Sequence, residues 1–245
     1  MKNWMIAVAV VLGLGLVLYF SDRPVKTPSG IDLIRDANQY QDAQNKASGY
    51  ALTVFQKANA GEEITEEDKG KLRDALKYFD AMTIFEPRHV TSFFGAGYCH
   101  MLLGEKEKAA ESFEQSIINI QTDPLRDQQT IRLTVFEAMS LLSETTLDLA
   151  SQEIGNFNSL AQANDMKGAE EAKKRAQIYY DKAYKYANSA VESKPDAFRY
   201  WLARANVLLA LKRESEAKSD VLQAFKLAPT DPRVQMMVKM LKLKI

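Results

Sequence analysis

One interval recurs along this chain and limits what it can fold into. Thirty-four residues separate Ala75 from Ala109 and Phe79 from Phe113. The same interval returns in three pairs further on, which are Ala183 and Ala217, Ala190 and Ala224, and Pro195 and Pro229. A period of this length is typical of a helical solenoid, in which each repeat is a pair of antiparallel helices too small to bury its apolar face alone. The sequence therefore predicts an all-α fold of stacked αα-hairpins.

Two stretches of the chain supply, in order, the residue types that stacked hairpins need. Small residues permit close helix crossings, large residues fill the gaps, and a glycine or proline ends a helix. The stretch from Val90 to Pro124 contains Phe93, Ala96, Gly97, Gly104, Ala109, Phe113 and Ser116. The stretch from Phe198 to Pro229 contains Trp201, Ala205, Ala217, Val221 and Ala224.

These positions resemble the tetratricopeptide repeat (TPR) family, over most of residues 31–245. The chain departs from the family pattern at His100, where a tyrosine is usual, at Arg204, where a leucine is usual, and at Val221, where an aromatic residue is usual. The resemblance implies a TPR-like right-handed superhelix whose concave groove binds a peptide or helix of a partner protein. The direct matches are Gly97, Ala109, Phe113, Trp201, Ala217, Ala224 and Pro229.

The resemblance also implies which residues bind the partner, because the first helix of each pair lines the groove in this family. In one repeat these residues are Phe94, Tyr98, Met101 and Leu102, and in the last repeat they are Arg199, Leu202, Asn206, Leu209 and Ala210. The first set suits an apolar stripe of a partner helix or an extended apolar segment. Family members that clamp a C-terminal carboxylate use lysine and asparagine where Phe94 and Tyr98 stand, so no such clamp is predicted. The alternative is that neighbouring helices cover some of these side chains.

The first twenty residues are predicted to form a transmembrane anchor. Trp4 to Phe20 is an unbroken run without a charged residue. As a helix this run is about 25 Å long, at the short end of what spans a bilayer. Trp4 and Tyr19 suit aromatic anchors at the two interfaces. A cleaved signal peptide is the alternative, since Lys2 gives a basic start, but Tyr19, Phe20 and Ser21 are not the small-residue pattern that cleavage favours.

Residues 21–30 read as a short, partly stiff linker, because they contain two prolines and end in Ser29 and Gly30. Ten extended residues reach at most about 35 Å, so the following domain, residues 31–245, would stay close to the membrane. The charges Lys2, Arg23 and Lys26 leave the orientation nearly undecided. A short polar lead before a long domain favours a signal anchor. We therefore expect a single-pass protein of the bacterial inner membrane with an extracytoplasmic (periplasmic) domain.

Turn and cap signals predict the helices of this domain. An amphipathic helix is predicted over 31–58, and Thr65 with Asp68 resembles a capping box that begins a helix reaching about Phe85. Two helices of ordinary repeat length follow near 89–103 and 106–121. A last helix, 231–245, is predicted to cap the apolar face of the preceding repeat. The alternative for this helix is a basic amphipathic segment that contacts anionic lipid or a partner, with adaptable methionines at Met236, Met237 and Met240.

The middle of the chain departs from the 34-residue period. Ala183 follows its counterpart Ala109 by seventy-four positions, which is one period plus an insertion of forty. One interpretation is an elongated repeat with helices near 127–153 and 167–194, and with an intervening loop marked by Gly155, Asn156, Asn158, Asn164 and Asp165. The alternative is two degenerate repeats within 125–195. A long hairpin would protrude as an extra contact surface or simply lengthen the core.

The sequence contains no pattern that predicts catalysis or a cofactor. Lys plus Arg equals Asp plus Glu at 32 each, so the chain has no net charge to attract nucleic acid. His89 and His100 have no metal-ligand spacing, and Cys99 is the single cysteine. Gly95 and Gly97 stand within a predicted helix and serve close packing rather than phosphate binding. The chain is thus predicted not to be an enzyme, to hold no metal and no cofactor, and to have no small-molecule substrate.

Two functions are consistent with these residues. The first is a membrane-anchored scaffold or adaptor that binds proteins in its groove during assembly or export of envelope proteins. The second is a permanent accessory or structural subunit of a larger membrane complex. Gly13 and Gly15 lack the four-residue spacing that favours tight pairing of membrane helices, which favours a plain anchor and the first function.

Overall fold

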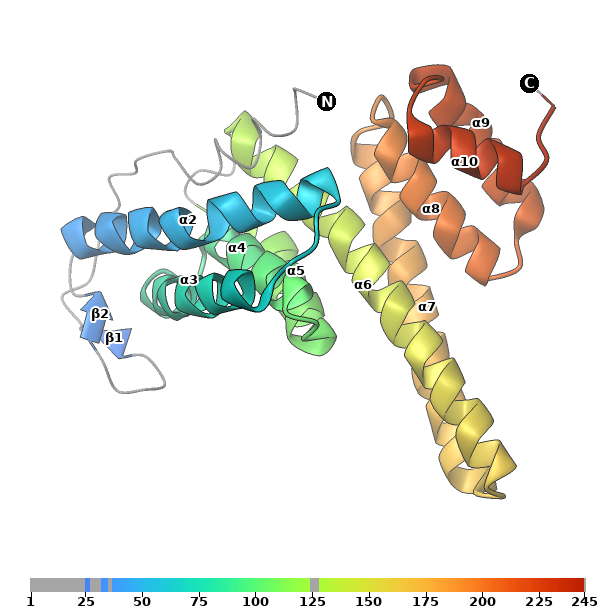
Figure 1. Ribbon diagram of the computed structural model, residues 1–245, viewed down its shortest axis with the longest axis horizontal. Coiled ribbons are helices and arrows are strands. Elements are labelled where there is room, and N and C mark those ends of the chain that lie inside the picture. The colour runs from blue at the N-terminus through green and yellow to red at the C-terminus, as the bar shows by residue number, and fades with distance from the viewer. Residues whose placement is uncertain (1–24, 27–31, 35–36, 124–127, 245) are drawn as a thin grey trace. The chain divides into compact units, whose positions relative to one another are not determined.

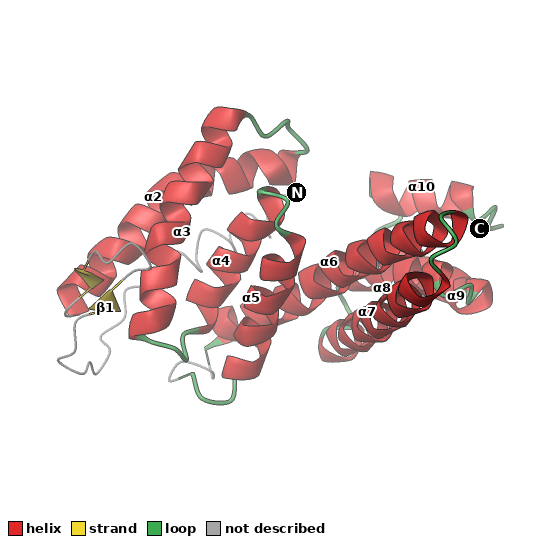
Figure 2. Ribbon diagram, turned by 90° about the horizontal axis from the view of Figure 1, so that it is seen from below, coloured by secondary structure: helices red, strands yellow, loops and turns green. Residues whose placement is uncertain are grey.

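The computed structural model describes residues 25–26, 32–34, 37–123 and 128–244. Apart from two short strands, the regular structure in these ranges is helical (Figure 2). The helices are α2 (Ala37–Ala60), α3 (Glu66–Phe85), α4 (Val90–Leu102), α5 (Lys106–Asn119), α6 (Gln129–Gln162), α7 (Met166–Ser193), α8 (Phe198–Ala210), α9 (Glu214–Leu227) and α10 (Pro232–Met240). The predicted helical-repeat architecture is confirmed over these ranges.

The chain divides into two compact units, one up to Ala138 and one from Met139 onward, with the boundary inside α6. The single continuous domain over residues 31–245 and its right-handed superhelix therefore stay predictions. The predicted anchor, residues 1–20, and most of the predicted linker, residues 21–30, lie outside the described residues.

A two-stranded antiparallel pair corrects the prediction that the first helix begins at residue 31. Strand β1 (Val25–Lys26) pairs with β2 (Asp32–Ile34), and Ile34 is fully buried against the first unit. The helix begins only at Ala37. A helix continued back from the buried Tyr40 would place Asp36, four residues earlier, on the apolar stripe, which disfavours the longer helix.

In the first unit each of the helices α2 to α5 packs against the next one along the chain (Figure 1). The predicted capping box at the start of α3 is confirmed. The Asp68 amide donates to the Thr65 hydroxyl at 3.2 Å, and the Thr65 amide donates to an Asp68 carboxylate oxygen at 3.2 Å. Lys57 of α2 also donates to this carboxylate at 2.9 Å. The Lys57 and Thr65 contacts hold the pKa of Asp68 at about 2, so the cap also joins α2 to α3.

The 34-residue period has a direct physical basis in the contact of two phenylalanines with two helical glycines. Gly95 and Gly97 lie in α4, where glycine costs helix stability relative to alanine. A Cβ atom added to Gly97 would lie 2.7 Å from the Phe113 ring, and one added to Gly95 would clash with the Phe79 ring. Both rings are buried. The predicted packing role of these glycines is confirmed.

A buried polar cluster, which no local pattern in the sequence predicts, fixes the start of α4. The Tyr40 hydroxyl of α2 lies 2.8 Å from Nδ1 of His89, and Ser92 Oγ lies 2.7 Å from the same nitrogen. The Val90 amide donates to Asp123 at 2.9 Å. Desolvation by burial lowers the pKa of His89, although the nearby carboxylates of Asp123 and Glu86 oppose this shift. His89 is therefore held neutral at a junction of α2 with α4.

In the second unit the part of α6 after residue 138 lies beside α7 (Figures 1 and 2). The predicted loop residues Gly155, Asn156 and Asn158 lie inside α6, and the turn is confined to residues 163–165. The loop prediction was wrong at these three positions because they lie on an exposed side of the helix, where glycine and asparagine are tolerated. The two unbroken helices support one elongated repeat over 125–195 rather than two degenerate ones.

The last helix is shorter than predicted but covers the preceding repeat. Instead of running over residues 231–245, α10 ends at Met240, and Lys242 adopts a left-handed backbone conformation that stops the helix. Its buried side chains join a core with α8 and α9. The predicted capping role is confirmed. The residues of α10 in this core are Val234, Met237 and Val238.

Replacing Gly97 with alanine should destabilise the first unit. The added methyl group forces the buried Phe113 ring to move, and overpacking of this kind costs about 1–3 kcal/mol, more than the roughly 1 kcal/mol that alanine gains in a helix. Gly70→Ala in α3 is the matched control, because no atom lies within 4 Å of an added Cβ there. Hydrogen exchange of α3 to α5 amides measures both changes. If Gly70→Ala destabilised the first unit as much as Gly97→Ala does, or more, this packing would be contradicted.

The stability of the first unit should fall as pH drops from about 7 to 5. In the unfolded chain His89 takes up a proton near its ordinary pKa of about 6.5, whereas burial lowers the pKa of His89 in the folded chain. The contribution of His89 to the unfolding free energy is therefore present above this pH and is lost as the pH falls below it. The slope is at most about 1.4 kcal/mol per pH unit for one proton. Exchange protection of α2 amides across this pH range measures it. His89→Gln should flatten the profile, and an unchanged profile would mean that other groups cause it.

Candidate functional site

Two of the four residues predicted to bind a partner through α4 lie in the core of the first unit. Phe94 and Tyr98 are only 5% and 6% exposed. Their rings stack on each other at 6.2 Å, and Phe55 of α2 meets the Tyr98 ring edge-on at 4.5 Å. The Tyr98 hydroxyl donates to Asn59 of α2. These two aromatic residues support the helix stack and offer a partner little surface, as the covered-side-chain alternative anticipated.

The remaining predicted residues differ in how much of their side chains a partner could reach. Met101 and Leu102 are half-buried at the end of α4. On α8, Leu202 is 7% exposed and belongs to the core shared with α9 and α10. Asn206 is exposed and Leu209 is half-buried. The α8 surface that a partner could reach is therefore polar at its middle and apolar toward its end.

Arg199 and Ala210 stand near the two ends of α8. The Arg199 guanidinium donates to the Tyr200 hydroxyl at 2.9 Å and lies 4.8 Å from the centre of that ring. This contact draws Arg199 back onto its own helix and leaves it half-buried. Ala210 is exposed. The predicted α8 set is thus a continuous helix row whose members are not equally accessible.

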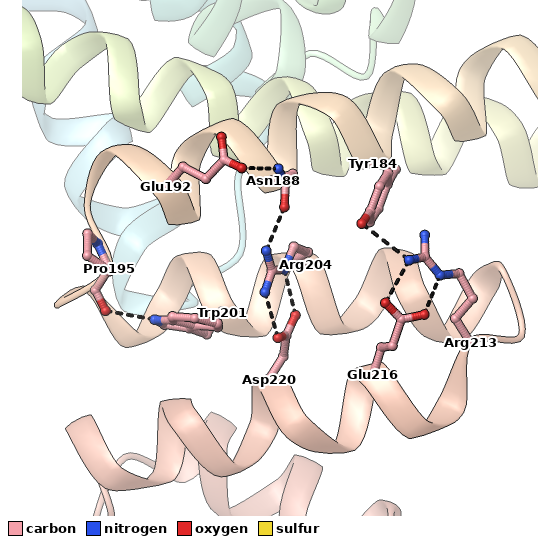
Figure 3. Close-up of polar contacts among 9 residues, drawn as sticks. All are labelled: Tyr184, Asn188, Glu192, Pro195, Trp201, Arg204, Arg213, Glu216 and Asp220. Carbon is pink, nitrogen blue, oxygen red and sulfur yellow. Dashed lines mark hydrogen bonds and ion pairs between the residues drawn. The ribbon is translucent and has the colours of Figure 1, made fainter.

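An arginine replaces a core leucine of the repeat and ties three helices together. Figure 3 shows Arg204 of α8 between Asn188 of α7 and Asp220 of α9. It donates to both oxygens of Asp220 at 2.8 Å and to Asn188 at 2.6 Å. The Asp220 bond raises the pKa of Arg204 further. Because Asp220 is buried, this departure from the family pattern is a buried ion pair with its hydrogen bonds satisfied.

Further contacts surround this network, and their residues are drawn in Figure 3. The Trp201 indole donates to the Pro195 carbonyl at 2.7 Å, and the Arg204 guanidinium lies 5.0 Å from the Trp201 ring. Arg213 pairs with Glu216 at 2.7 Å and lies 4.4 Å from the Tyr184 ring. The tryptophan that begins the repeat pattern therefore closes the turn between α7 and α8, and Arg204 over Trp201 and Arg213 over Tyr184 add cation–π contacts.

The groups that could take part in chemistry are dispersed. Burial raises the pKa of the Cys99 thiol well above its ordinary value, which keeps it unreactive. His100 pairs with Glu105 at 2.8 Å across the turn between α4 and α5. Over the ranges that the structure describes, no three His, Cys, Asp or Glu side chains are grouped so as to hold a metal ion. In the same ranges no helix combines the length and apolar character needed to cross a bilayer.

Sequence reasoning left two exposed methionines of α10 outside the predicted site. Met236 and Met240 are 63% and 55% exposed. They stand one full repeat period after Leu202 and Asn206, so the repeat interval itself assigns them to the same row of the next helix. The sequence analysis favoured a cap for this helix and kept a partner-binding surface with Met236 and Met240 as the alternative.

A sequence model of the tetratricopeptide repeat family matches residues 65–124 and 174–232. Both segments are similar to tetratricopeptide repeats and are called the first and second TPR segments below. The first TPR segment contains α3, α4 and α5, and the second runs from within α7 through α9. Helices α2 and α6 lie outside the matched ranges, as does the part of α7 before residue 174. No curated protein matches the chain by sequence.

Several solved structures resemble the chain weakly. The structure of MamA from residue 41 onward, from Desulfovibrio magneticus RS-1, is 14% identical and has a TM-score of 0.28, over 77% of this chain and 98% of that one. YrrB, described as a TPR protein with an unusual peptide-binding site, is 14% identical with a TM-score of 0.29, over 82% and 97%. An assembly chaperone of RpL4 is 13% identical with a TM-score of 0.39, over 83% and 75%. With TM-scores below 0.5, these likenesses carry no argument about partners.

Removing the carboxylate of Asp220 should destabilise the second unit. Asp220→Ala leaves the Arg204 guanidinium without its bidentate partner in a half-buried place, which should cost about 2–3 kcal/mol of unfolding free energy. Glu216→Ala is the control, since it breaks an exposed pair worth no more than about 1 kcal/mol. Urea unfolding followed by Trp201 fluorescence, in a chain that carries Trp4→Phe, reports on this unit. Equal costs for the two variants would show that the buried pair contributes nothing special.

Proposed function

We propose that this chain is a scaffold that binds other proteins through the accessible faces of its repeat helices and is held at a membrane by residues 1–20. The supporting observation is the exposed row on α8 and α10 within the second TPR segment and the helix that follows it. Each repeat helix fixes its side chains through packing on one face, so the opposite face is a rigid platform. Such preorganisation lowers the entropic cost of binding an extended or helical segment.

The proposed contact residues are those that a partner can reach. They are Arg199, Asn206 and Leu209 on α8, with Met101 and Leu102 on α4 as a second, smaller surface. Phe94, Tyr98 and Leu202 lie beneath these surfaces and set their shape. A partner segment with apolar anchors near Leu209 and hydrogen-bonding groups near Asn206 would match the α8 row.

The membrane part of the proposal is supported by the sequence alone. The uncharged run from Trp4 to Phe20 is long enough to anchor the chain, and the short linker would keep the repeats near the bilayer. We place the repeats on the periplasmic side of a bacterial inner membrane, where proteins undergoing export or assembly would be within reach. A lasting subunit role in a larger complex is the competing outcome of the experiment below.

A photo-crosslinker at Asn206, in the full-length chain in native membranes, should capture a protein. The matched control is the same crosslinker at Ser219, which is exposed on α9 outside the proposed row. Capture from Ser219 but not from Asn206 would overturn the assignment of the binding face. Sizing after detergent extraction separates the two roles. A stoichiometric complex that persists without crosslinking would contradict the adaptor and identify a subunit.

A further inference from the structure

The outer face of α10 presents two methionines flanked by cations. Met236 and Met240 are four residues apart, so they lie on one face of the helix. Arg233 and Lys239, at three residues before Met236 and one before Met240, flank that face. All four side chains are exposed. This set of four residues is called the α10 methionine face below.

The repeat interval places this face in the binding row. Leu202 and Asn206 of α8 correspond to Met236 and Met240 of α10, one repeat period further along the chain. Leu202 is buried in the core that α8 shares with α10, whereas Met236 is 63% exposed at the equivalent position. The position that is covered at Leu202 on α8 is therefore uncovered at Met236 on α10, while Asn206 and Met240 are both exposed. A helix laid on the α10 methionine face would cover Met236 as the fold already covers Leu202.

The charges around the α10 methionine face indicate which kind of partner helix it could bind. Residues 232–244 contain four basic residues and no acidic one. Arg233 pairs with Asp231 at 3.2 Å. Over residues 25–26, 32–34, 37–123 and 128–244, no ion pair involving Lys239, Lys242 or Lys244 is found. Unpaired cations beside an apolar strip are complementary to an acidic amphipathic partner.

We propose that the α10 methionine face binds an acidic amphipathic helix of a partner protein. The inference rests on the proposed scaffold function and names the chemistry of the partner at the last helix of the row. Methionine suits this role because its flexible, polarisable side chain adapts to different apolar anchors. The partner's apolar residues would contact Met236 and Met240 at i, i+3 and i+4 spacing, and its carboxylates would face Lys239 and its neighbours.

Two other occupants fit the face less well. A second copy of this chain, pairing α10 with α10, would bring the same lysines together, and like charges in contact oppose association. A lipid surface is bound by helices with a broad apolar face that is rich in leucine and aromatic residues. The exposed apolar part of α10 is only two methionines wide, because its other apolar residues are committed to the core with α9.

The test measures binding of a designed peptide to the full-length chain in phosphatidylcholine nanodiscs. The probe is a fluorescent 18-residue helix with leucines on one face and glutamates on the other, and its counterpart carries lysines in place of the glutamates. Fluorescence anisotropy should detect the acidic helix and not the basic one. Met236→Glu with Met240→Glu should weaken binding at least about ten-fold, because both apolar contacts are lost and repulsion is added. Lys239→Glu should weaken it about three-fold and reduce its salt dependence.

Met166→Glu is the matched control, since Met166 is equally exposed, at 68%, but lies at the start of α7. It should leave binding within about two-fold of the unmodified chain, and melting curves should show all variants folded. Failure of the acidic helix to bind, equal binding of the basic helix, or an equal loss in Met166→Glu would overturn the inference. So would a dimer, or adhesion to phosphatidylglycerol vesicles, that Met236→Glu abolishes. Crosslinking from Asn206 without peptide binding would overturn this inference and leave the scaffold function standing.

Discussion

The contact between a bare helical backbone and an aromatic ring is the constraint on which the first unit depends. Gly97 allows the Phe113 ring to approach α4 more closely than any side chain would permit, and Gly95 does the same for Phe79 of the preceding repeat. Each contact joins α4 to a neighbouring helix, and α4, with 13 residues, is too short to be stable alone. The two rings are one repeat period apart in the sequence, so the period follows from the way in which the hairpins stack.

In the second unit the helices pack closely through alanines and a buried ion pair rather than through glycines and aromatic rings. Alanines along α7 allow close approach, and Ala183 and Ala187 form a small core with Val207 of α8. Where a leucine would usually complete the layer, Arg204 joins α7, α8 and α9 by charge-assisted hydrogen bonds. A buried pair of this kind adds little net stability over an apolar layer but penalises any misaligned register. This network joins α8, and so the row on its surface, to α7 and α9.

The sequence predicted what local chemistry dictates and failed where tertiary contacts decide. Thr65 with Asp68 indicated the start of α3, and Gly95 with Gly97 indicated close helix packing at α4. Gly155 was misread as a loop because a turn residue on the exposed side of a long helix leaves the same signal as a true turn. For the site, the family resemblance placed Tyr98 in the binding row, but only the fold reveals that Phe55 and Asn59 of α2 lie against it. No local pattern could foretell that Arg204 would find two polar partners on other helices.

The most direct test of this account is the thermodynamic coupling between position 97 and position 113. Gly97→Ala, Phe113→Leu and the double variant are compared by unfolding or by exchange protection of α4 and α5. If the ring and the missing side chain truly share one space, the smaller leucine relieves the added methyl group, and the double variant loses less stability than the sum of the single losses by about 0.5–3 kcal/mol. Strict additivity would mean that the two positions do not interlock, and the packing argument for the repeats would fail.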